Sequence, residues 1–209
     1  MDTKVVKFGG SSLADAGQFK KVADIVLADP ARRFVVASAP GKRFSGDIKV
    51  TDMLYGCYDL AVKGESFDKE FAAIEERFDG IISELGIDLS LETEFANNAF
   101  AHRAGRDYAA SRGEYLNSIV LAKYLGYDFV DPAGYIRFDE KGSFDLETTR
   151  SLLAPKLASL EHAVIPGFYG SMPNDTIKTF SRGGSDVTGS IVANAVNAVL
   201  YENWTGVSG

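Results

Sequence analysis

The sequence is poor in cysteine and histidine, the side chains that most often build disulfides and metal sites. Its single cysteine, Cys57, cannot form a disulfide within the chain, which excludes a disulfide-stabilised secreted scaffold. Cys57 lies in an apolar stretch, where a buried packing role is favoured over that of a nucleophile. His102 and His162 have no partners at metal-ligand spacing. The sequence therefore predicts no metal site built from its own side chains.

Long hydrophobic runs and an excess of positive charge are also absent. No stretch of about 18 apolar residues could cross a membrane, and no charged-then-apolar leader is visible. The formal net charge of -7 offers no basic surface to nucleic acid or anionic lipid. We therefore expect a cytoplasmic protein without nucleic-acid or membrane partners, in which local cations hold any anionic substrate.

What is present is typical of a globular chain. Hydrophobic residues make up 45% and charged residues 24% of the 209 positions, and we find no repeats, low-complexity tracts or interdomain linker. Short β-branched runs alternate with longer stretches of helical periodicity. This alternation favours an α/β fold with a mostly parallel sheet and helices on both faces.

The expected elements follow one another along the whole chain. Strands are predicted at 3–8, 33–37, 127–130, 162–166 and 176–180, with a hairpin at 135–138 and 144. Helices are predicted at 12–28, 51–63, 67–85, 91–105, 111–125, 148–158 and 186–199.

Two glycine-rich turns each join a predicted strand to a predicted helix. The first reads Lys-Phe-Gly-Gly-Ser-Ser at residues 7–12, and the second reads Ser-Arg-Gly-Gly-Ser-Asp at residues 181–186. Free N–H groups at a helix start, unobstructed by a Cβ atom, bind anions, so the pair of turns predicts phosphate chemistry. Lys7 adds a cation to the first turn, while Arg182 and Asp186 add a cation and a carboxylate to the second.

Neither turn matches a familiar nucleotide-binding motif. A dinucleotide fingerprint needs a third glycine where Leu13 stands, and Gly41-Lys42 lacks the preceding glycine of a P-loop. Structural alternatives stay open for both turns. Lys7 could be a rim lysine beside a tight turn, and Asp186 could stabilise the start of a helix that Ser185 caps.

A third motif lies between the turns, at residues 111–114. Ser-Arg-Gly-Glu matches the helix-capping box, in which the serine and glutamate side chains satisfy free N–H groups at a helix start. On spacing alone, this structural interpretation of Ser111 and Glu114 is favoured over ligand binding.

Taken together, the motifs resemble those of aspartate kinase, within the amino acid kinase fold. The similar segments are residues 4–12, 36–42, 111–114, 166–168 and 181–186, in this order and from end to end of the chain. The resemblance implies a three-layer α/β sandwich, with a mostly parallel central sheet and helices on both faces, incomplete at its C-terminus. It implies that residues 1–209 form a catalytic domain truncated before the nucleotide half is complete, without the ACT regulatory domains.

The resemblance implies transfer of the γ-phosphoryl group of ATP to the β-carboxylate of L-aspartate. The product, 4-phospho-L-aspartate, would begin lysine, threonine and methionine biosynthesis, with Mg²⁺ carried by the nucleotide and a homo-oligomeric full-length protein. The substrate carboxylate attacks directly, so no protein nucleophile is needed. Two alternatives stay open: a related kinase of this fold acting on another carboxylate, and, for this chain, a non-catalytic ligand-binding module.

The resemblance also implies roles in phosphoryl transfer. Lys7 would stabilise the transferring phosphoryl group, and Asp186 would help to organise the reacting centre. The residues expected at the nucleotide are Lys7, Gly9, Gly10, Ser11 and Thr205. The family usually has an aspartate after the Trp-Thr pair, whereas this chain has Gly206, which removes one carboxylate expected near ATP.

The implied substrate-binding residues come from five parts of the chain. Glu114 would hold the substrate ammonium group, and Arg182 would hold a substrate carboxylate. The other residues expected to line the pocket are Ser38, Thr51, Phe168 and Ser185. We further expect no feedback inhibition by lysine or threonine in this chain, and association through exposed apolar surface.

Overall fold

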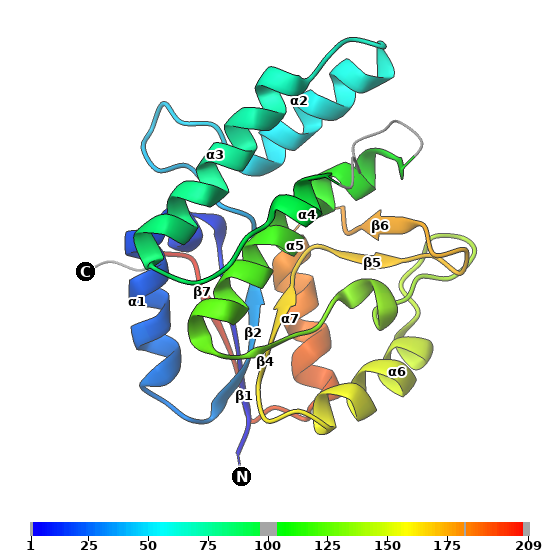
Figure 1. Cartoon of the computed structure of the whole chain (residues 1–209). Helices are drawn as coiled ribbons and strands as arrows, with labels where there is room; N and C mark the ends of the chain where they lie inside the picture. Colours follow the sequence, from blue (N-terminus) through cyan, green and yellow to red (C-terminus); the bar gives the residue numbers. More distant parts are fainter. Residues whose placement is uncertain (1, 97–103, 182, 207–209) are drawn as a thin grey trace.

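A five-stranded parallel sheet forms the centre of the computed structural model, which describes residues 2–96, 104–181 and 183–206. The strands lie in the order β3-β4-β2-β1-β7 (Figure 1). Their bounds are β1 Lys4–Phe8, β2 Arg32–Ala37, β3 Asp128–Phe129, β4 Ala163–Pro166 and β7 Leu200–Trp204. All four neighbouring pairs are parallel, as the alternation of strands and helices predicted.

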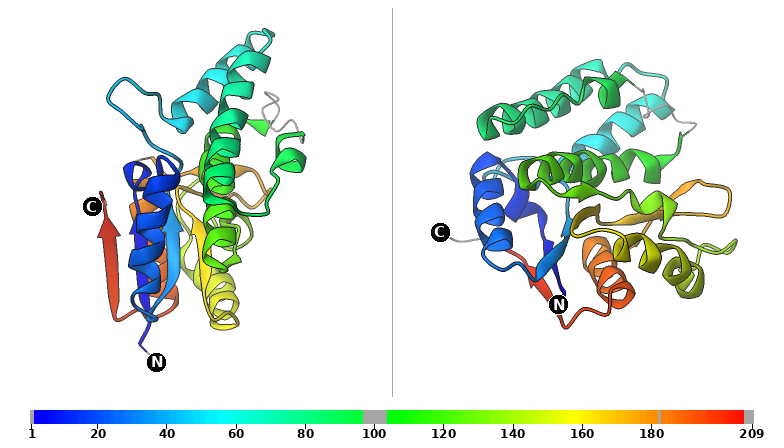
Figure 2. Two further views of the ribbon diagram at one scale, coloured as in Figure 1. Left: turned by 60° about the vertical axis from the view of Figure 1, so that its left-hand side comes forward. Right: turned by 60° about the horizontal axis from the view of Figure 1, so that its bottom comes forward.

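Helices cover both faces of this sheet (Figure 2). One face carries α1 Ala16–Leu27 and α5 Arg106–Leu125, with α2 Val50–Val62, α3 Asp68–Leu85 and the short α4 Glu92–Ala96 packed around them. The other face carries α6 Leu146–Ala158 and α7 Gly184–Ala195. The predicted three-layer sandwich is confirmed. No helix within the described ranges is long and apolar enough to cross a membrane.

Two hydrophobic cores, one on each face, hold the layers together. Alternate residues of a strand point to opposite faces, so Val35 of β2 enters the core with α1 and α5, while Phe34 and Val36 enter the core with α6 and α7. A strand buried on both faces reads as a continuous apolar run, which is why β1, β2 and β4 were predictable.

A second, two-stranded antiparallel sheet joins β5 Tyr169–Ser171 to β6 Ile177–Thr179. The predicted strand at 176–180 is therefore present, but it pairs outside the main sheet. The predicted hairpin at 135–144 is reduced to a single bridge between Phe138 and Phe144. The reason is competition, because the N–H of Phe138 donates to the carbonyl oxygen of Ser171 at 2.9 Å.

The capping box predicted at Ser111 and Glu114 is wrong. Helix α5 begins at Arg106, so both residues lie inside the helix, where the Ser111 hydroxyl donates to the carbonyl oxygen of Tyr108 at 2.7 Å. The Glu114 side chain is thereby free to face the end of the sheet. The helix predicted at 91–105 is present as α4, and residues 97–103 lie outside the described residues.

The starts of α1 and α7 also differ from prediction. A 3-10 turn, η1 Gly10–Leu13, precedes α1, and the Asp15 carboxylate caps α1 by accepting from the N–H of Gln18 at 2.9 Å. Ser185 is not the cap of α7, because Gly183 holds that position with a left-handed φ of 56°. The helix ends at Ala195 rather than 199, which leaves residues 200–204 to form β7.

These elements bring the two glycine turns together. The strands run upwards in Figure 1, and the turns after β1 and before α7 meet at their carboxyl ends. In parallel α/β sheets, ligands bind outside the carboxyl ends of the strands.

Candidate functional site

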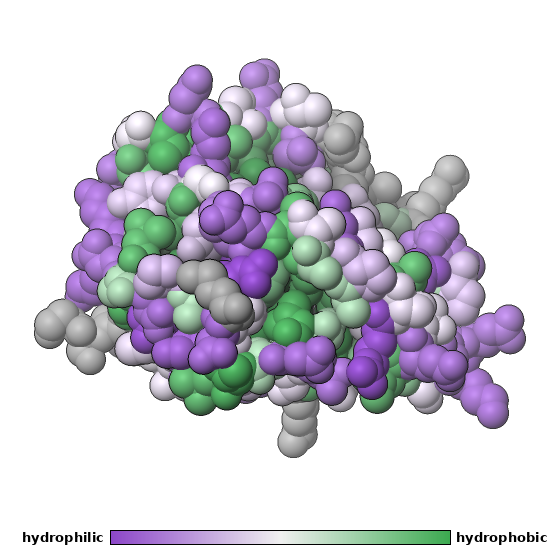
Figure 3. All heavy atoms as spheres, turned by 90° about the horizontal axis from the view of Figure 1, so that it is seen from below, coloured by the Kyte–Doolittle hydropathy of each residue, from purple (hydrophilic) through white to green (hydrophobic). Residues whose placement is uncertain are grey.

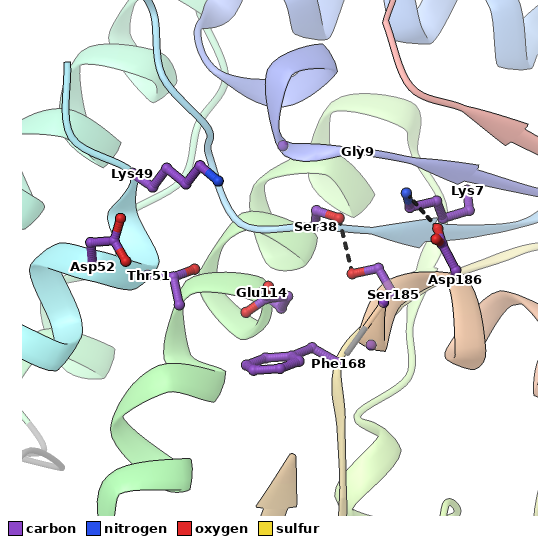
Figure 4. Close-up of a pocket in the computed structure, with 13 residues that line it drawn as sticks. Lys7, Gly9, Ser38, Lys49, Thr51, Asp52, Glu114, Phe168, Ser185 and Asp186 are labelled. Atoms are coloured by element: carbon purple, nitrogen blue, oxygen red, sulfur yellow. Dashed lines mark hydrogen bonds and ion pairs between the residues drawn. The ribbon is translucent and has the colours of Figure 1, made fainter. Parts of the chain in front are cut away.

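A pocket of about 360 Å³ lies at the carboxyl ends of β1, β2 and β4 (Figure 4). The predicted site residues that line it are Lys7, Gly9, Gly10, Ser38, Thr51, Glu114, Phe168, Ser185 and Asp186. Residues as far apart in the sequence as Lys7 and Asp186 thus share one cavity. Gly183 and Gly184 of the second glycine turn also line it, together with Lys49 and Asp52, which the predictions did not include.

Three predicted site residues do not line this pocket. Ser11 lines an adjoining hollow of about 440 Å³ that also contains Lys42 and Lys49. Thr205 lies beside that hollow, and its carbonyl oxygen accepts from the Ser11 hydroxyl at 2.8 Å. Arg182 lies outside the described residues.

An ion pair occupies one side of the pocket. The ammonium nitrogen of Lys7 lies 2.7 Å from Asp186 Oδ1, and Lys7 is 8% exposed. The side chain of Asn203 in β7 contacts both partners. Its Oδ1 accepts from the Lys7 ammonium group at 3.3 Å, and its Nδ2 donates to Asp186 Oδ1 at 3.0 Å. These contacts hold the Lys7 ammonium group above the first glycine turn, where a Cβ atom on Gly9 would lie 3.6 Å from it.

The first glycine turn is crossed by the loop that follows β2. The N–H of Gly41 donates to the carbonyl oxygen of Gly10 at 2.8 Å. A Cβ atom on Gly41 would lie 2.6 Å from the carbonyl carbon of Gly10, far inside a normal contact. Glycine at position 41 is therefore required by close approach of two backbones, and the crossing fixes the shape of the turn.

Glu114 contributes a buried carboxylate in the middle of the pocket, with Lys7 and Asp186 on one side and Lys49 and Asp52 on the other (Figure 4). It is 6% exposed, and its Oε2 has no hydrogen-bond partner. Burial in a weakly polar environment disfavours the charged form and raises the pKa of Glu114 to about 8. A buried acceptor without a partner is costly, so this atom is suited to a cationic donor from a ligand.

A direct hydrogen bond joins the loop after β2 to the second glycine turn. The Ser38 hydroxyl donates to Ser185 Oγ at 2.9 Å, and the amide of Asn117 donates to the Ser38 carbonyl oxygen at 2.8 Å. Asn117 lies one turn after Glu114 on α5. The same helix therefore supplies the buried carboxylate and holds the neighbouring loop in place.

Phe168 lies over the second glycine turn in a strained conformation. Its φ of 85° is in the left-handed region, at a cost of order 1–3 kcal/mol. Its N–H donates to Thr188 Oγ1 at 3.0 Å, which holds this conformation from α7. A Cβ atom on Gly184 would overlap the Phe168 ring, so the second glycine is required for packing.

Lys49 and Asp52 complete the charged lining. Both are exposed and flank Thr51 at the start of α2. The sequence signal that could have found them is their position beside the predicted pocket residue Thr51, at the end of a polar loop.

Another hollow, of about 540 Å³, lies at the opposite end of the sheet. Figure 3 shows that end of the molecule, where hydrophobic patches lie among hydrophilic residues. The Arg33 side chain in this hollow is already bonded, to Thr3 Oγ1 at 2.9 Å and to the carbonyl oxygens of Leu160 and Glu161 at 2.9 and 2.6 Å. The described residues that line this hollow lack the combination of glycine turns, lysines and carboxylates that lines the first pocket.

The pocket can therefore hold a ligand with groups of opposite charge. Lys7, Lys49 and the glycine turns suit anionic oxygens, and the buried Glu114 carboxylate suits an ammonium group. Within the ranges described, no group of three or more histidine, cysteine, aspartate or glutamate side chains is placed to hold a metal ion.

Comparison with known proteins shows the family of the chain. A family model described as "Amino acid kinase family" matches residues 2–209. Aspartokinase 3 of Bacillus subtilis is 38% identical over 98% of this chain and 48% of its own length. Lysine-sensitive aspartokinase 3 of Escherichia coli is 28% identical over 98% of this chain and 49% of its own length.

Solved structures give the same result. Aspartate kinase of Clostridium acetobutylicum superposes with a TM-score of 0.96 at 51% identity, over 100% of this chain and 49% of its own. E. coli aspartokinase III, in complex with aspartate and ADP, superposes with a TM-score of 0.81 at 26% identity, over 100% of this chain and 50% of its own. The chain thus spans about half the length of these relatives. The resemblance to aspartate kinase seen in the motifs is confirmed.

Proposed function

Because the chain belongs to the amino acid kinase family, we propose that it is catalytic sequence of an ATP-dependent aspartate kinase. The relatives named aspartokinase, one of them solved with aspartate and ADP, support this proposal. The observation that carries it is the buried Glu114 carboxylate, whose Oε2 has no hydrogen-bond partner and which shares one pocket with Lys7 and both glycine turns.

L-aspartate would bind through its three charged groups. Its ammonium group would pair with Glu114, and Arg182 would bind its α-carboxylate. The β-carboxylate would then point towards Lys7. The remaining contacts would come from residues that line the pocket, namely Ser38, Thr51, Phe168 and Ser185.

ATP would bind at the first glycine turn. Gly9 and Gly10 leave room for phosphate oxygens because neither has a Cβ atom, although the N–H of Gly9 itself donates to the carbonyl oxygen of Trp204 at 3.0 Å. Ser11 lies in the adjoining hollow and Lys7 lies above the turn, so the residues present fit a triphosphate. Thr205 would flank the nucleotide, where Gly206 provides no carboxylate. Mg²⁺ would arrive with the nucleotide and neutralise phosphate charge when bound.

The reaction is an in-line displacement. An oxygen of the substrate β-carboxylate forms a bond to the γ-phosphorus while the bond from that phosphorus to the β-phosphate oxygen breaks. ADP leaves with the bonding electron pair, and 4-phospho-L-aspartate is formed. Lys7 would neutralise charge on the transferring group, and Asp186 would hold the lysine in position.

Residues 1–209 would form an amino acid kinase catalytic domain without the complete nucleotide half or the ACT regulatory domains. This proposal is supported by the relatives, because the chain covers only about half of their length. The full-length protein would be a cytoplasmic homo-oligomer in lysine, threonine and methionine biosynthesis.

The proposal is tested by thermal unfolding with L-aspartate and with succinate, which has both carboxylates but no ammonium group. A ligand selective for the folded state stabilises it by about 2.7 kcal/mol at about a hundred times its Kd. We expect L-aspartate alone to raise the midpoint, and Glu114→Gln to abolish the effect. Equal shifts with succinate and L-aspartate would contradict the proposed role of the pocket, and D-aspartate and L-glutamate test its fit further.

A further inference from the structure

Arg77 of α3 is a buried cation that lies outside the pocket. Its side chain is 4% exposed, although arginine is almost never buried without partners. Its guanidinium group donates to the carbonyl oxygens of Ile48 at 2.8 Å, Ala14 at 3.2 Å and Gly41 at close range. One side chain therefore joins α3 to two separate loops.

The carbonyl groups bound by Arg77 belong to the segments that shape the pocket. Gly41 crosses the first glycine turn, with its N–H bonded to Gly10. Ile48 immediately precedes Lys49, which extends towards the middle of the pocket in Figure 4. Ala14 follows the 3-10 turn that begins at Gly10. A planar guanidinium group can bind three such acceptors at once, which a lysine cannot do with the same geometry.

The charge of Arg77 is balanced inside the same loop. Asp47 Oδ2 lies 3.7 Å from the Arg77 guanidinium group. Arg43 binds both oxygens of that carboxylate, at 2.7 and 2.9 Å, and these bonds hold the pKa of Asp47 well below its usual range. Asp47 therefore stays ionised beside Arg77.

Arg77 supplies hydrogen bonds and an ion pair between α3 and this loop. A hollow of about 450 Å³ lies beside them, and its lining includes Asp47, Ile48 and Arg77. Phe44 and Ile48 are 62% and 57% exposed, so the apolar side chains of the loop do not anchor it. Arg77 thus joins the loop to α3, while the N–H of Gly41 joins it to the first glycine turn.

We propose that Arg77 is a positioning residue for the pocket. It holds the loop from Gly41 to Lys49 against the first glycine turn, so that Lys49 and Thr51 face the ligand. The identity of that ligand rests on the proposed function, whereas the effect on the loop does not.

The effect on the loop is tested by hydrogen exchange in the chain without ligand. The amides of Gly41, Asp47 and Val50 report on it, because each donates to a carbonyl oxygen of this region. In Arg77→Ala we expect them to exchange about tenfold faster or more, with α7 unchanged. Arg33→Ala is the matched control, since Arg33 also bonds two carbonyl oxygens, at the far end of the sheet.

The effect on binding is tested by titrating L-aspartate. Arg77→Ala should weaken binding about tenfold or more, guanidinium ion at non-denaturing concentrations should restore it, and Arg33→Ala should leave it unchanged. If Arg77→Ala does not fold, it is replaced by Arg77→Lys, which keeps the positive charge but lacks the planar guanidinium group.

Uniformly faster exchange, or unchanged L-aspartate affinity in the variant, would overturn the proposal. If the wild-type chain binds no L-aspartate, the proposed function fails, while the exchange experiment still decides whether Arg77 holds the loop.

Discussion

Lys7 and Lys4 lie on the same strand, and each forms an ion pair at 2.7 Å, yet Lys7 alone of the two lines the pocket. In the proposed kinase reaction, Lys7→Ala should lower kcat about 10³-fold, because it removes the cation proposed to neutralise charge on the transferring phosphoryl group. L-aspartate affinity should change little. The measurement is the rate of acyl phosphate formation, trapped with hydroxylamine. Lys4→Ala, which breaks the pair with Asp29, serves as control and should retain activity.

The buried Glu114 carboxylate makes stability depend on pH. Its pKa is raised from 4.5 to about 8, so between these values the folded chain keeps a proton that the unfolded chain has released. The folded state therefore binds more protons, and the free energy of unfolding falls as pH rises through this window. Glu114→Gln should reduce this fall by more than about 1 kcal/mol. Urea unfolding at about pH 5 and pH 8 measures this fall in the free energy of unfolding. A variant with the same pH dependence as the wild type would refute the assignment of the fall to Glu114. Glu140→Gln, at an exposed position, is the control.

The same carboxylate should couple L-aspartate binding to proton release. An ammonium group pairs with ionised Glu114, so below about pH 8 the ligand must displace a proton from it. Titration calorimetry in two buffers of different ionisation enthalpy measures the protons released. We expect release at about pH 6.5 in the wild type and none in Glu114→Gln. Equal heats in both buffers for the wild type would show that the ammonium group binds elsewhere.

At the scale of elements, the crossing of two loops at Gly41 should be intolerant of a methyl group. Gly41→Ala places a Cβ atom 2.6 Å from the Gly10 backbone and should cost about 1–3 kcal/mol of stability. Gly80→Ala is its matched control in α3, because no atom lies within 4 Å of the added group. There, the better helix propensity of alanine should stabilise the chain by about 0.5–1 kcal/mol. The denaturant midpoints of the two variants measure their stabilities. Equal changes in stability would contradict the proposed steric conflict at position 41.

Elements with a strong apolar pattern were predictable, whereas those defined by tertiary contacts were not. Helix α3 ends at Leu85 as predicted, before Gly86 in a left-handed conformation. The strand at 200–204 was missed, because it carries Glu202 and Asn203 and forms by pairing with distant β1. The start of α5 was wrong because a local capping pattern cannot reveal that Glu114 faces a pocket instead.

The candidate site was predictable where a motif contains it. The two glycine turns predicted Lys7 and Asp186 as site residues. The resemblance predicted Glu114, although the local spacing favoured a helix cap. Lys49 and Asp52 were missed, because their position depends on how the loop before α2 folds over Arg77. The hydrophobic periodicity of the sequence cannot predict a contact between this loop and Arg77.

At the scale of the whole molecule, β7 forms one edge of the sheet. It pairs with β1 on one side, and no described strand pairs with its other side. Val199 and Leu200 are 59% and 47% exposed there, and an exposed edge strand with apolar side chains promotes association. Sedimentation velocity should show concentration-dependent association that Leu200→Lys reduces. Leu27→Lys, equally apolar but on helix α1, should not reduce it. A monodisperse monomer at all concentrations would contradict this expectation.

The bond between Lys7 and Asn203 spans 196 positions, and the bond between Ser11 and Thr205 spans 194. Contacts so distant in sequence form late in folding, because the entropy of closing the loop opposes them until other structure exists. On the ribosome, β1 emerges long before β7, the strand with which it pairs. The first glycine turn is thus synthesised well before its partners, and Lys7 acquires Asp186 and Asn203 among the last events of folding.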